Sequence, residues 1–351
     1  PSSSQGLGVV MPEITPVPRP DQQARLAVAD ALSTSVRGDS FGTLNDVASW
    51  LAACQGVAPA APLQRTRVIV FAGAHGIATR TFEGVGLSAF APESDAEQLT
   101  ELAEGAGPAH TMARRTGASI HVVECAPSGS IDVEPAMSTE EFDAAFTLGQ
   151  TTADAEIDAG ADLLIPAELG VGGTSVAAVL MGNFTATEPV VIVGPGSGTT
   201  DAMWKTKVTV IRDAMFRIRN LDGIEVIKAA SSPSFAALVG FMCQAAARRT
   251  PMLIDGPLTA TAAVYAEKLA PGVKHWLYAA SATTEPSHIK ALELLKLQPL
   301  LELRMRAGQG LAALSAVPLI DAAVELAGDE LAALAAAESN ESQAPAAEYE
   351  D

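Results

Sequence analysis

The stretch LLIPAELGVGGTS, residues 163–175, decides the fold class of this 351-residue chain. An apolar run from Leu163 to Pro166 leads through Glu168 into a glycine-rich turn, and the apolar run VAAVLM follows Ser175. A strand, a glycine turn and a helix start in this order indicate a βαβ unit. Such a turn places bare backbone N–H groups at the positive end of a helix, which suits a phosphate. The stretch therefore predicts an anion site with a carboxylate beside it.

Five further apolar runs predict strands of the same sheet. They are TRVIVFAG (66–73), SIHVVE (119–124), PVVIVG (189–194), PMLIDG (251–256) and HWLYAA (275–280). Helical patterns separate most of them, and short apolar strands alternating with helices form right-handed units around a parallel sheet. We therefore expect an α/β fold with a parallel, Rossmann-like, doubly wound sheet.

Composition limits the partners and the compartment. The net charge of −19 argues against nucleic acids and anionic membranes, because phosphate backbones need basic patches. The cysteines Cys54, Cys125 and Cys243 are scattered and odd in number, which favours free thiols in a reducing compartment. The sequence shows no signal-peptide pattern and nothing close to the roughly 20-residue apolar span of a membrane helix. We expect a cytoplasmic protein with no membrane partner.

Several glycine-rich or polar turns follow the predicted strands. They occupy residues 73–76, 168–174, 194–198, 255–256 and 281–285. Ligands of an open parallel sheet bind at the carboxyl ends of its strands. We therefore expect these turns to converge on one edge of the sheet.

Together these turns resemble the nicotinate-nucleotide:dimethylbenzimidazole phosphoribosyltransferase family of cobalamin assembly. The resemblance runs in order from about residue 37 to about residue 324. Its segments are VFAGAHGIA, LLIPAELGVGGTSVAAVL, VGPGSGTTDAMW, RRTPMLIDGPLTATAA and TTEPSHIKALELLKLQPLLELRMRAGQG. It implies a homodimer whose subunit adds a second, smaller helical domain, built from both chain ends, to the α/β domain.

The resemblance also implies an activity. The family moves the phosphoribosyl group of nicotinate mononucleotide onto a nitrogen of 5,6-dimethylbenzimidazole, with no metal and no cofactor. The small-molecule partners implied are therefore a nucleotide and a benzimidazole base. The expected domain plan is an extended segment (1–20), helices of the small domain (21–60), the large domain (61–300), further small-domain helices (301–336) and an acidic disordered tail (337–351).

The sequence departs from the family pattern at the expected site. The family's proposed general base is the Glu of a Gly-Glu-Gly string, which here reads Gly308-Gln309-Gly310. A glutamine accepts a hydrogen bond but cannot take a proton at neutral pH. Further departures are Ala74 for an Asp, Gly173-Thr174-Ser175 for Asn-Thr-Thr, Ser231-Ser232 for Gly-Gly, Ser281 for a His, Leu311-Ala312-Ala313 for Gly-Thr-Gly, and Glu97 in the place of a Gln.

The resemblance assigns candidate site residues, and most of them have a structural alternative. Glu168 is a candidate acid or base, or only a carboxylate stabilised by a helix dipole. Gln309 is a candidate ligand contact, or a loop residue facing water. The candidate substrate-binding residues, which are otherwise turn formers or ordinary loop hydroxyls, are Ser88, Gly170, Gly172, Gly173, Thr174, Gly196, Ser197, Gly198, Gly308 and Gly310.

Four further polar residues leave two interpretations open. His75 is either catalytic or a satisfied buried histidine, and Asp255 either caps a helix or holds the ribose. Glu285 and His288 either cap a helix or contact a ligand. We expect no metal site, because His288 has no cysteine or second histidine at metal-ligand spacing.

Two hypotheses of function follow. The first is a phosphoribosyltransferase of weak or altered activity, in which Glu168 carries the proton transfer. The second is a non-catalytic relative that keeps a nucleotide or base pocket as a binding or regulatory module. The simultaneous changes at one edge of the sheet favour the second, and the long ordered resemblance favours the first.

Overall fold

The computed structural model describes residues 12–196 and 198–345. The chain divides into two compact units. The large unit contains Arg65–Ala316 and the described residues up to Pro18. The small unit contains Arg19–Gln64 and the described residues from Val317 onward.

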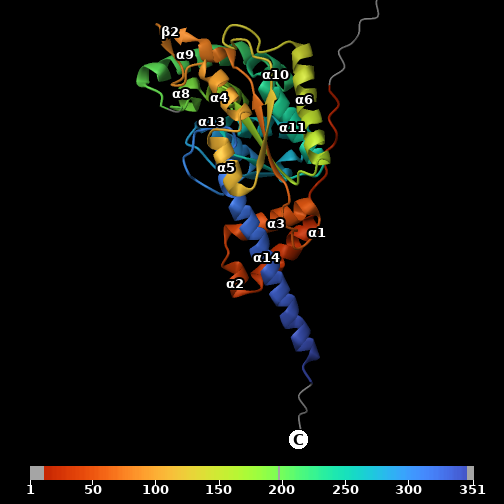
Figure 1. Cartoon of the computed structure of the whole chain (residues 1–351). Helices are drawn as coiled ribbons and strands as arrows, with labels where there is room; N and C mark the ends of the chain where they lie inside the picture. Colours follow the sequence, from red (N-terminus) through yellow and green to blue (C-terminus); the bar gives the residue numbers. More distant parts are fainter. Residues whose placement is uncertain (1–11, 197, 346–351) are drawn as a thin grey trace, which may run out of the picture. The chain divides into compact units, whose positions relative to one another are not determined.

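A five-stranded parallel sheet forms the centre of the large unit (Figure 1). Its strands are β1 (Thr66–Ala72), β4 (Ser119–Glu124), β5 (Leu163–Leu169), β6 (Met252–Ile254) and β7 (Leu277–Ala279). Their order in the sheet is β4-β1-β5-β6-β7. The chain therefore leaves β1 in one direction and later continues from β5 in the other. This reversal makes the carboxyl ends of β1 and β5 the switch point, where ligands of such sheets bind.

The sheet lies inside the large unit because its two central strands are apolar. Val68, Ile69, Val70 and Phe71 of β1 have no solvent exposure. Helix α11 (Pro233–Ala247) packs on β1 and β5 and runs along α6 (Thr139–Asp158). The Phe71 ring meets the Phe241 ring of α11 edge to face, with 5.6 Å between centroids. Burial of this kind contributes about 25 cal/mol per Å² of apolar surface to folding stability. Because β1 and β5 lie in this core, their carboxyl ends are held in place at the switch point.

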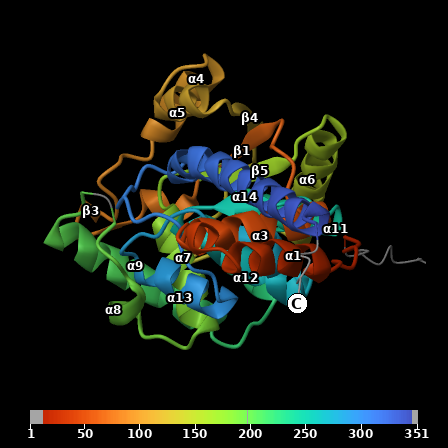
Figure 2. The ribbon, with the colours of Figure 1, turned by 90° about the horizontal axis from the view of Figure 1, so that it is seen from below.

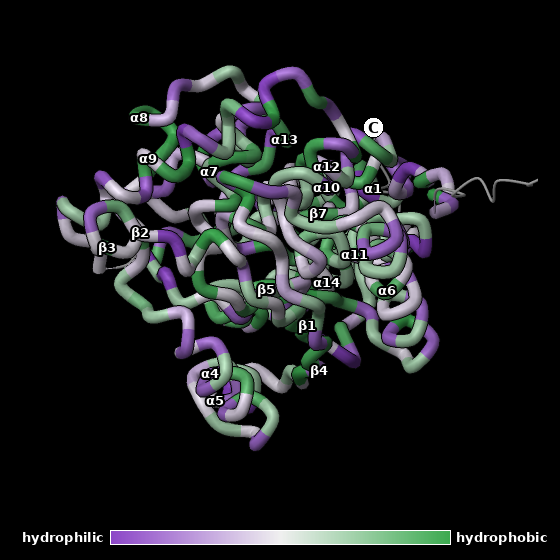
Figure 3. Tube along the Cα trace, turned by 90° about the horizontal axis from the view of Figure 1, so that it is seen from above, coloured by the Kyte–Doolittle hydropathy of each residue, from purple (hydrophilic) through white to green (hydrophobic). Residues whose placement is uncertain are grey.

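The other elements of the large unit connect and cover these strands. Two short strands, β2 (Thr81–Phe82) and β3 (Val85–Gly86), form an antiparallel pair. The remaining helices are α4 (Ser94–Ala103), α5 (Pro108–Thr116), α7 (Gly173–Phe184), α8 (Pro189–Ile192), α9 (Asp201–Ile218), α10 (Ile224–Ala230), α12 (Pro257–Leu269) and α13 (Pro286–Leu295), with 3₁₀ turns at Gly76–Thr79 and Val273–Trp276. Figure 3 shows α4 and α5 projecting outward next to the edge strand β4.

One predicted strand is wrong. Residues 189–194 begin with helix α8 instead of a strand. Pro189 occupies the first turn of that helix, where its fixed φ suits a helix start. Val190 and Val191 are 57% and 55% exposed, so this apolar run is not a core element. The other five predicted strands form the sheet.

The small unit is helical and combines segments from distant parts of the sequence. It contains α1 (Gln22–Ser33), α2 (Val36–Asp39), α3 (Thr43–Gln55) and most of α14 (Leu311–Gln343) (Figure 2). The carboxylate of Glu330 on α14 accepts hydrogen bonds from the Ser35 hydroxyl (2.8 Å) and the Arg37 guanidinium (2.7 Å). These contacts join the early helices to the last one.

Helix α14 differs from expectation in its length and in its composition. Residues 337–343 were expected to be disordered, yet the helix continues to Gln343. Pro345 follows the helix and disfavours helical backbone at the residue before it, whereas Pro318 lies within the helix. The expectation that no segment approaches a membrane span is also wrong, because α14 is long and apolar enough to cross one. Half of its most apolar 18-residue window is buried within the protein, as in the core helix of a soluble protein.

Candidate active site

The glycine turn after β5 lies at the switch point. Gly172 caps α7 with a φ of 95°, a conformation that favours glycine. Gly170 is closely packed, because a methyl group added there would lie 2.4 Å from the Gly73 carbonyl oxygen and 3.0 Å from the His75 ring. The turn after β5 therefore fits against the turn after β1 only with glycine. As a result, the first amides of α7 lie beside Glu168.

A second loop reaches Glu168 from near the end of the chain. Gly308, Gln309 and Gly310 all have positive φ, at 67°, 58° and 76°. The Gln309 amide donates to the Glu168 carbonyl oxygen at 3.1 Å. Gln309 is only 4% exposed, so the interpretation as a loop residue facing water is wrong. Two segments about 140 residues apart thus meet at Glu168.

Two pockets adjoin at this point. The first, here called the threonine pocket, has about 700 Å³ of space, and the second, the glycine-turn pocket, has about 780 Å³, including space open to solvent. The residues that line both pockets are Glu168, Thr174, Gly196, Arg306, Ala307 and Gly308. Glu168 therefore stands where two ligands bound side by side would meet.

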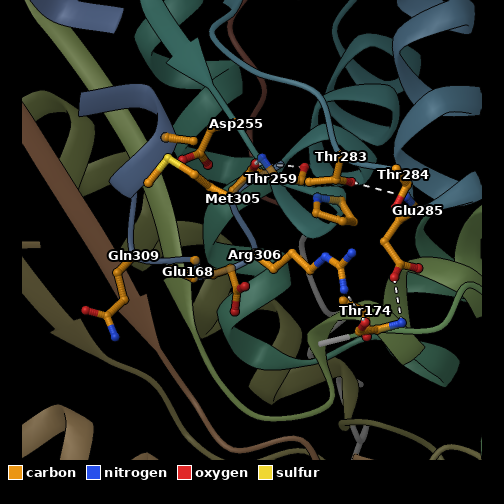
Figure 4. Close-up of a pocket in the computed structure, with 16 residues that line it drawn as sticks. Glu168, Thr174, Asp255, Thr259, Thr283, Thr284, Glu285, Met305, Arg306 and Gln309 are labelled. Atoms are coloured by element: carbon orange, nitrogen blue, oxygen red, sulfur yellow. Dashed lines mark hydrogen bonds between the residues drawn. The ribbon is translucent and has the colours of Figure 1, made fainter. Parts of the chain in front are cut away.

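Each pocket has its own chemistry. Hydroxyls are prominent in the threonine pocket, which Asp255, Thr259, Thr283, Thr284, Glu285 and Met305 also line (Figure 4). The glycine-turn pocket adds backbone amides and apolar surface, together with the carboxylate of Asp95 and the carboxamide of Gln98. Its further residues include Leu87, Ser88, Phe90, Gly170, Gly172, Gly173 and Lys207.

Glu168 has unusual electrostatics for a carboxyl group. Its Oε2 atom is buried and has no hydrogen-bond partner in the part of the chain that the structure describes. Loss of solvation, followed by the negative charges of Asp255 and Asp95, raises the pKa of Glu168 to about 8. The carboxyl is therefore mostly protonated at neutral pH and becomes a base in the mildly alkaline range.

Two cations border the pockets. Lys207 of α9 is 2% exposed, and its Nζ donates to the Thr174 hydroxyl at 2.7 Å. Burial lowers the pKa of Lys207, and the charge of Glu285 partly opposes this shift. Arg306 donates from Nη1 to the Gly196 carbonyl oxygen at 3.1 Å. A positive group therefore lies close to the first turn of α7, as an anion site requires.

The structure brings most of the predicted substrate-binding residues to the glycine-turn pocket, namely Ser88, Gly170, Gly172, Gly173, Thr174, Gly196 and Gly308. Gly198 and Gly310 line neither pocket. A methyl group on Gly310 would lie 3.1 Å from Val68 and 3.3 Å from Ala167, so this glycine lets the loop pack on β1 and β5. Ser197 lies outside the described residues.

The sequence did not single out four residues that line the site: Asp95, Gln98, Lys207 and Arg306. Gln309 donates from Nε2 to Gln98 Oε1 at 2.9 Å. Glu97, which was expected in the place of a family Gln, is exposed and lines neither pocket. The next residue along α4, Gln98, does line the glycine-turn pocket. The available signal for Lys207 was its place on the apolar face of α9, three and four residues before Val210 and Ile211.

The four residues with open interpretations play distinct parts. His75 is buried, but neither ring nitrogen has a partner within the described ranges, so it is not a satisfied core histidine. Asp255 accepts the Ala313 amide at 3.0 Å and also lines the threonine pocket. Glu285 accepts the Gly196 amide at 2.8 Å. His288 Nδ1 contacts the Thr283 hydroxyl at 2.9 Å.

No group of three His, Cys, Asp or Glu among the described residues is placed to hold a metal ion.

Comparisons with known proteins agree with this geometry. A family model described as phosphoribosyltransferase matches residues 17–338. A nicotinate-nucleotide–dimethylbenzimidazole phosphoribosyltransferase of Corynebacterium glutamicum is 44% identical over 306 residues, covering 83% of this chain and 84% of that protein. The corresponding protein of Mycobacterium ulcerans is 41% identical over 331 residues, covering 88% of this chain and 90% of that protein.

The chain belongs to the nicotinate-nucleotide:dimethylbenzimidazole phosphoribosyltransferase family.

Solved structures of this family share the fold. A structure of CobT from Thermus thermophilus matches with a TM-score of 0.80 and 28% identity, covering 88% of this chain and 95% of that one. A second structure from the same organism, named as the phosphoribosyltransferase, matches with a TM-score of 0.80 and 26% identity, covering 88% and 96%. The predicted resemblance and the parallel α/β fold are therefore confirmed.

Proposed function

We propose that this chain transfers the phosphoribosyl group of nicotinate mononucleotide to 5,6-dimethylbenzimidazole, forming α-ribazole 5′-phosphate and nicotinate. The observation that carries this proposal is the meeting of two pockets at Glu168. A transfer between two rings needs adjacent ring sites with the migrating sugar between them. The names of the relatives support the same substrates.

The 5′-phosphate belongs at the start of α7. The amides that follow Gly172 and the Nζ of Lys207 can all donate to phosphate oxygens there. Thr174, which now accepts from Lys207, adds a hydroxyl. Helix α7 has 12 residues, long enough for its dipole to favour an anion at this end.

The pyridine ring fits the threonine pocket. The carboxylate of nicotinate requires a cation and hydroxyl donors, which Arg306, Thr283 and Thr284 supply. The acceptor ring fits the glycine-turn pocket, where Leu87 and Phe90 offer apolar surface beside Ser88. Both rings then reach the shared wall at Glu168.

The transfer needs one proton acceptor. One nitrogen of the benzimidazole forms a bond to C1′ while the C1′–N bond to the pyridinium breaks and its electron pair stays on the leaving nicotinate nitrogen. The other benzimidazole nitrogen gives up its proton. Gln309 cannot take this proton, whereas Glu168 in its ionised form can. Glu168 also carries the charge that would stabilise a positive C1′.

A direct assay tests the proposal. Purified protein is incubated with nicotinate mononucleotide and dimethylbenzimidazole, and α-ribazole phosphate is measured for the wild type and for Gln309→Glu. We expect product from both proteins, with the faster rate in Gln309→Glu, because that variant supplies a second carboxylate. Absence of product together with absence of measurable substrate binding would rule out the proposed reaction.

The non-catalytic alternative rests on Gln309 and on the other departures from the family pattern, of which Gly173, Ser175 and Ala312 also line the pockets. The compared relatives are named as enzymes, which gives this alternative no support. It predicts binding of the substrates without turnover. In the same assay, restoration of activity only in Gln309→Glu would favour it.

The homodimer and the cytoplasmic location remain proposals. The resemblance supports the dimer, and the lack of a disulfide among the described residues Cys54, Cys125 and Cys243 supports a reducing compartment. Sedimentation analysis of the purified chain tests the dimer, since a monomer at micromolar concentration would contradict it.

A further inference from the structure

Helix α4 contributes two side chains to the site although it belongs to the edge of the large unit. Asp95 and Gln98 are three residues apart, so they share one face of the helix. Both line the glycine-turn pocket. Asp95 Oδ1 accepts the Val171 amide at 2.8 Å, and Gln98 Oε1 accepts from Gln309 at 2.9 Å. Only Leu102 of α4 is buried, so these two hydrogen bonds are its main polar attachment to the site.

Asp95 occupies a particular place in this arrangement. Val171 follows Glu168 by three residues, so Asp95 anchors the turn that immediately follows that carboxyl. One carboxylate oxygen of Asp95 is engaged, and its charge is directed into the pocket that Glu168 also lines. Burial raises the pKa of Asp95, while the Val171 amide opposes this shift and favours the ionised form.

We propose that Asp95 is a positioning residue for Glu168. It anchors the glycine turn and places a second negative charge beside Glu168. Glu168 thereby serves as the proton acceptor, a role that the side-chain amide of Gln309 cannot fill. The inference rests on the proposed transfer and deepens it. A carboxyl that holds its proton more tightly is a stronger base once ionised, and catalysis is most efficient when the base titrates near the working pH.

Other charged groups also face Glu168. They are Asp255 directly after β6, Lys207 of α9, Glu285 in the loop before α13 and Arg306 in the loop before α14. The titratable but neutral His75, in the turn after β1, packs against Gly170 of the glycine turn. Asp255 also raises the pKa of Glu168, but it anchors the start of α14 through Ala313. Asp95 lies on a peripheral helix, so its charge can be removed with less damage to the fold.

Three variants distinguish the hydrogen bond between Asp95 and the Val171 amide from the negative charge of Asp95. Asp95→Asn keeps an oxygen that can accept the Val171 amide but removes the charge. Asp95→Ala removes both. Glu97→Gln is the matched control, because it removes an equal charge from the same helix at an exposed position outside both pockets. Thermal unfolding of each variant confirms that it is folded.

The first measurement does not depend on activity. Protein labelled with carbon-13 at glutamate carboxyl groups is titrated by NMR, and the Glu168 signal is assigned by its loss in Glu168→Gln. We expect the Glu168 midpoint to fall by roughly half to one pH unit in Asp95→Asn and Asp95→Ala. It should stay in place in Glu97→Gln. An unmoved midpoint in Asp95→Asn, or an equal shift in Glu97→Gln, overturns the inference.

The second measurement uses the transfer assay. The midpoint of the pH–rate profile should move in parallel with the NMR midpoint in Asp95→Asn, with little change in KM. Asp95→Ala should in addition raise KM several-fold, because the turn loses its anchor. If the wild type forms no product, the proposed function fails, while the NMR titration still decides the coupling between Asp95 and Glu168.

Discussion

At the scale of single residues, the site depends on one carboxyl group whose surroundings oppose its ionisation. The pKa of Glu168 is raised to about 8, chiefly by loss of solvation. The group is protonated below this value and ionised above it. It can therefore act as a base only in the upper part of the physiological pH range, unless a cationic substrate ring favours its ionised form.

The pH dependence of the reaction tests this assignment. We expect kcat/KM of the wild type to rise with pH and to level off above about pH 8, because kcat/KM reports the ionisation of the free enzyme. Glu168→Gln should lower kcat by roughly 10²–10⁴-fold at pH 8. A Glu168→Gln variant with the wild-type rate would exclude Glu168 from the chemistry.

Close packing at Gly170 gives a second prediction. A methyl group at this position collides with the Gly73 carbonyl oxygen at 2.4 Å, so Gly170→Ala should destabilise the large unit by roughly 1–3 kcal/mol. Gly86→Ala is the control, since an added methyl group meets nothing within 4 Å there and φ is not positive. Chemical denaturation measures both. Equal stability of the two variants would mean that the turn yields without cost.

At the scale of helices and strands, sequence patterns predicted the features that residues adjacent in the chain determine. The strand, turn and helix around Glu168 were evident because apolar periodicity and glycine positions are local signals. Residues 189–194 had the same apolar character, yet they begin with a helix whose first turn holds Pro189, and they pair with no strand of the sheet. Composition alone cannot distinguish these two outcomes.

The site itself was predictable only in part for the same reason. The glycine turn and Glu168 belong to one continuous stretch. Asp95 and Arg306 reach it from α4 and from the loop before α14, and nothing in their local sequence marks them. Their places follow from the sheet order and from loop packing, which the sequence does not display directly.

Helix α14 gives a prediction of its own. Gly328 lies in the helix interior, and an added methyl group meets nothing within 4 Å. Gly328→Ala should therefore stabilise the protein by roughly 0.5–1 kcal/mol, because glycine loses more backbone entropy than alanine in a helix. The midpoint of urea denaturation should rise. A lower midpoint would show that the helix needs flexibility at this position.

At the scale of the whole molecule, buried histidines limit stability in acid. Burial lowers the pKa of His75 and of His288 to about 4 each. An unfolded chain binds these two protons near pH 6.5, whereas the folded protein does not bind them until about pH 4. Their contribution to folding stability is thus fully present above pH 6.5 and is lost as the pH falls towards 4.

This loss can be measured from unfolding curves at several pH values. We expect each histidine to reduce the free energy of unfolding by up to about 3 kcal/mol between pH 6.5 and pH 4. In His288→Gln, which keeps an acceptor for Thr283, the dependence should weaken by about half. An unchanged slope would place the acid sensitivity elsewhere.

The backbone of residues 308–310 has a consequence for how this chain can change. Three successive residues with positive φ and a main-chain bond to Glu168 define the loop, and all of these are main-chain features. Glutamine and glutamate codons differ at a single base. A point mutation in the gene could thus place a second carboxylate into an unaltered scaffold, so lineages of this protein can cross between the two chemistries without rebuilding the fold.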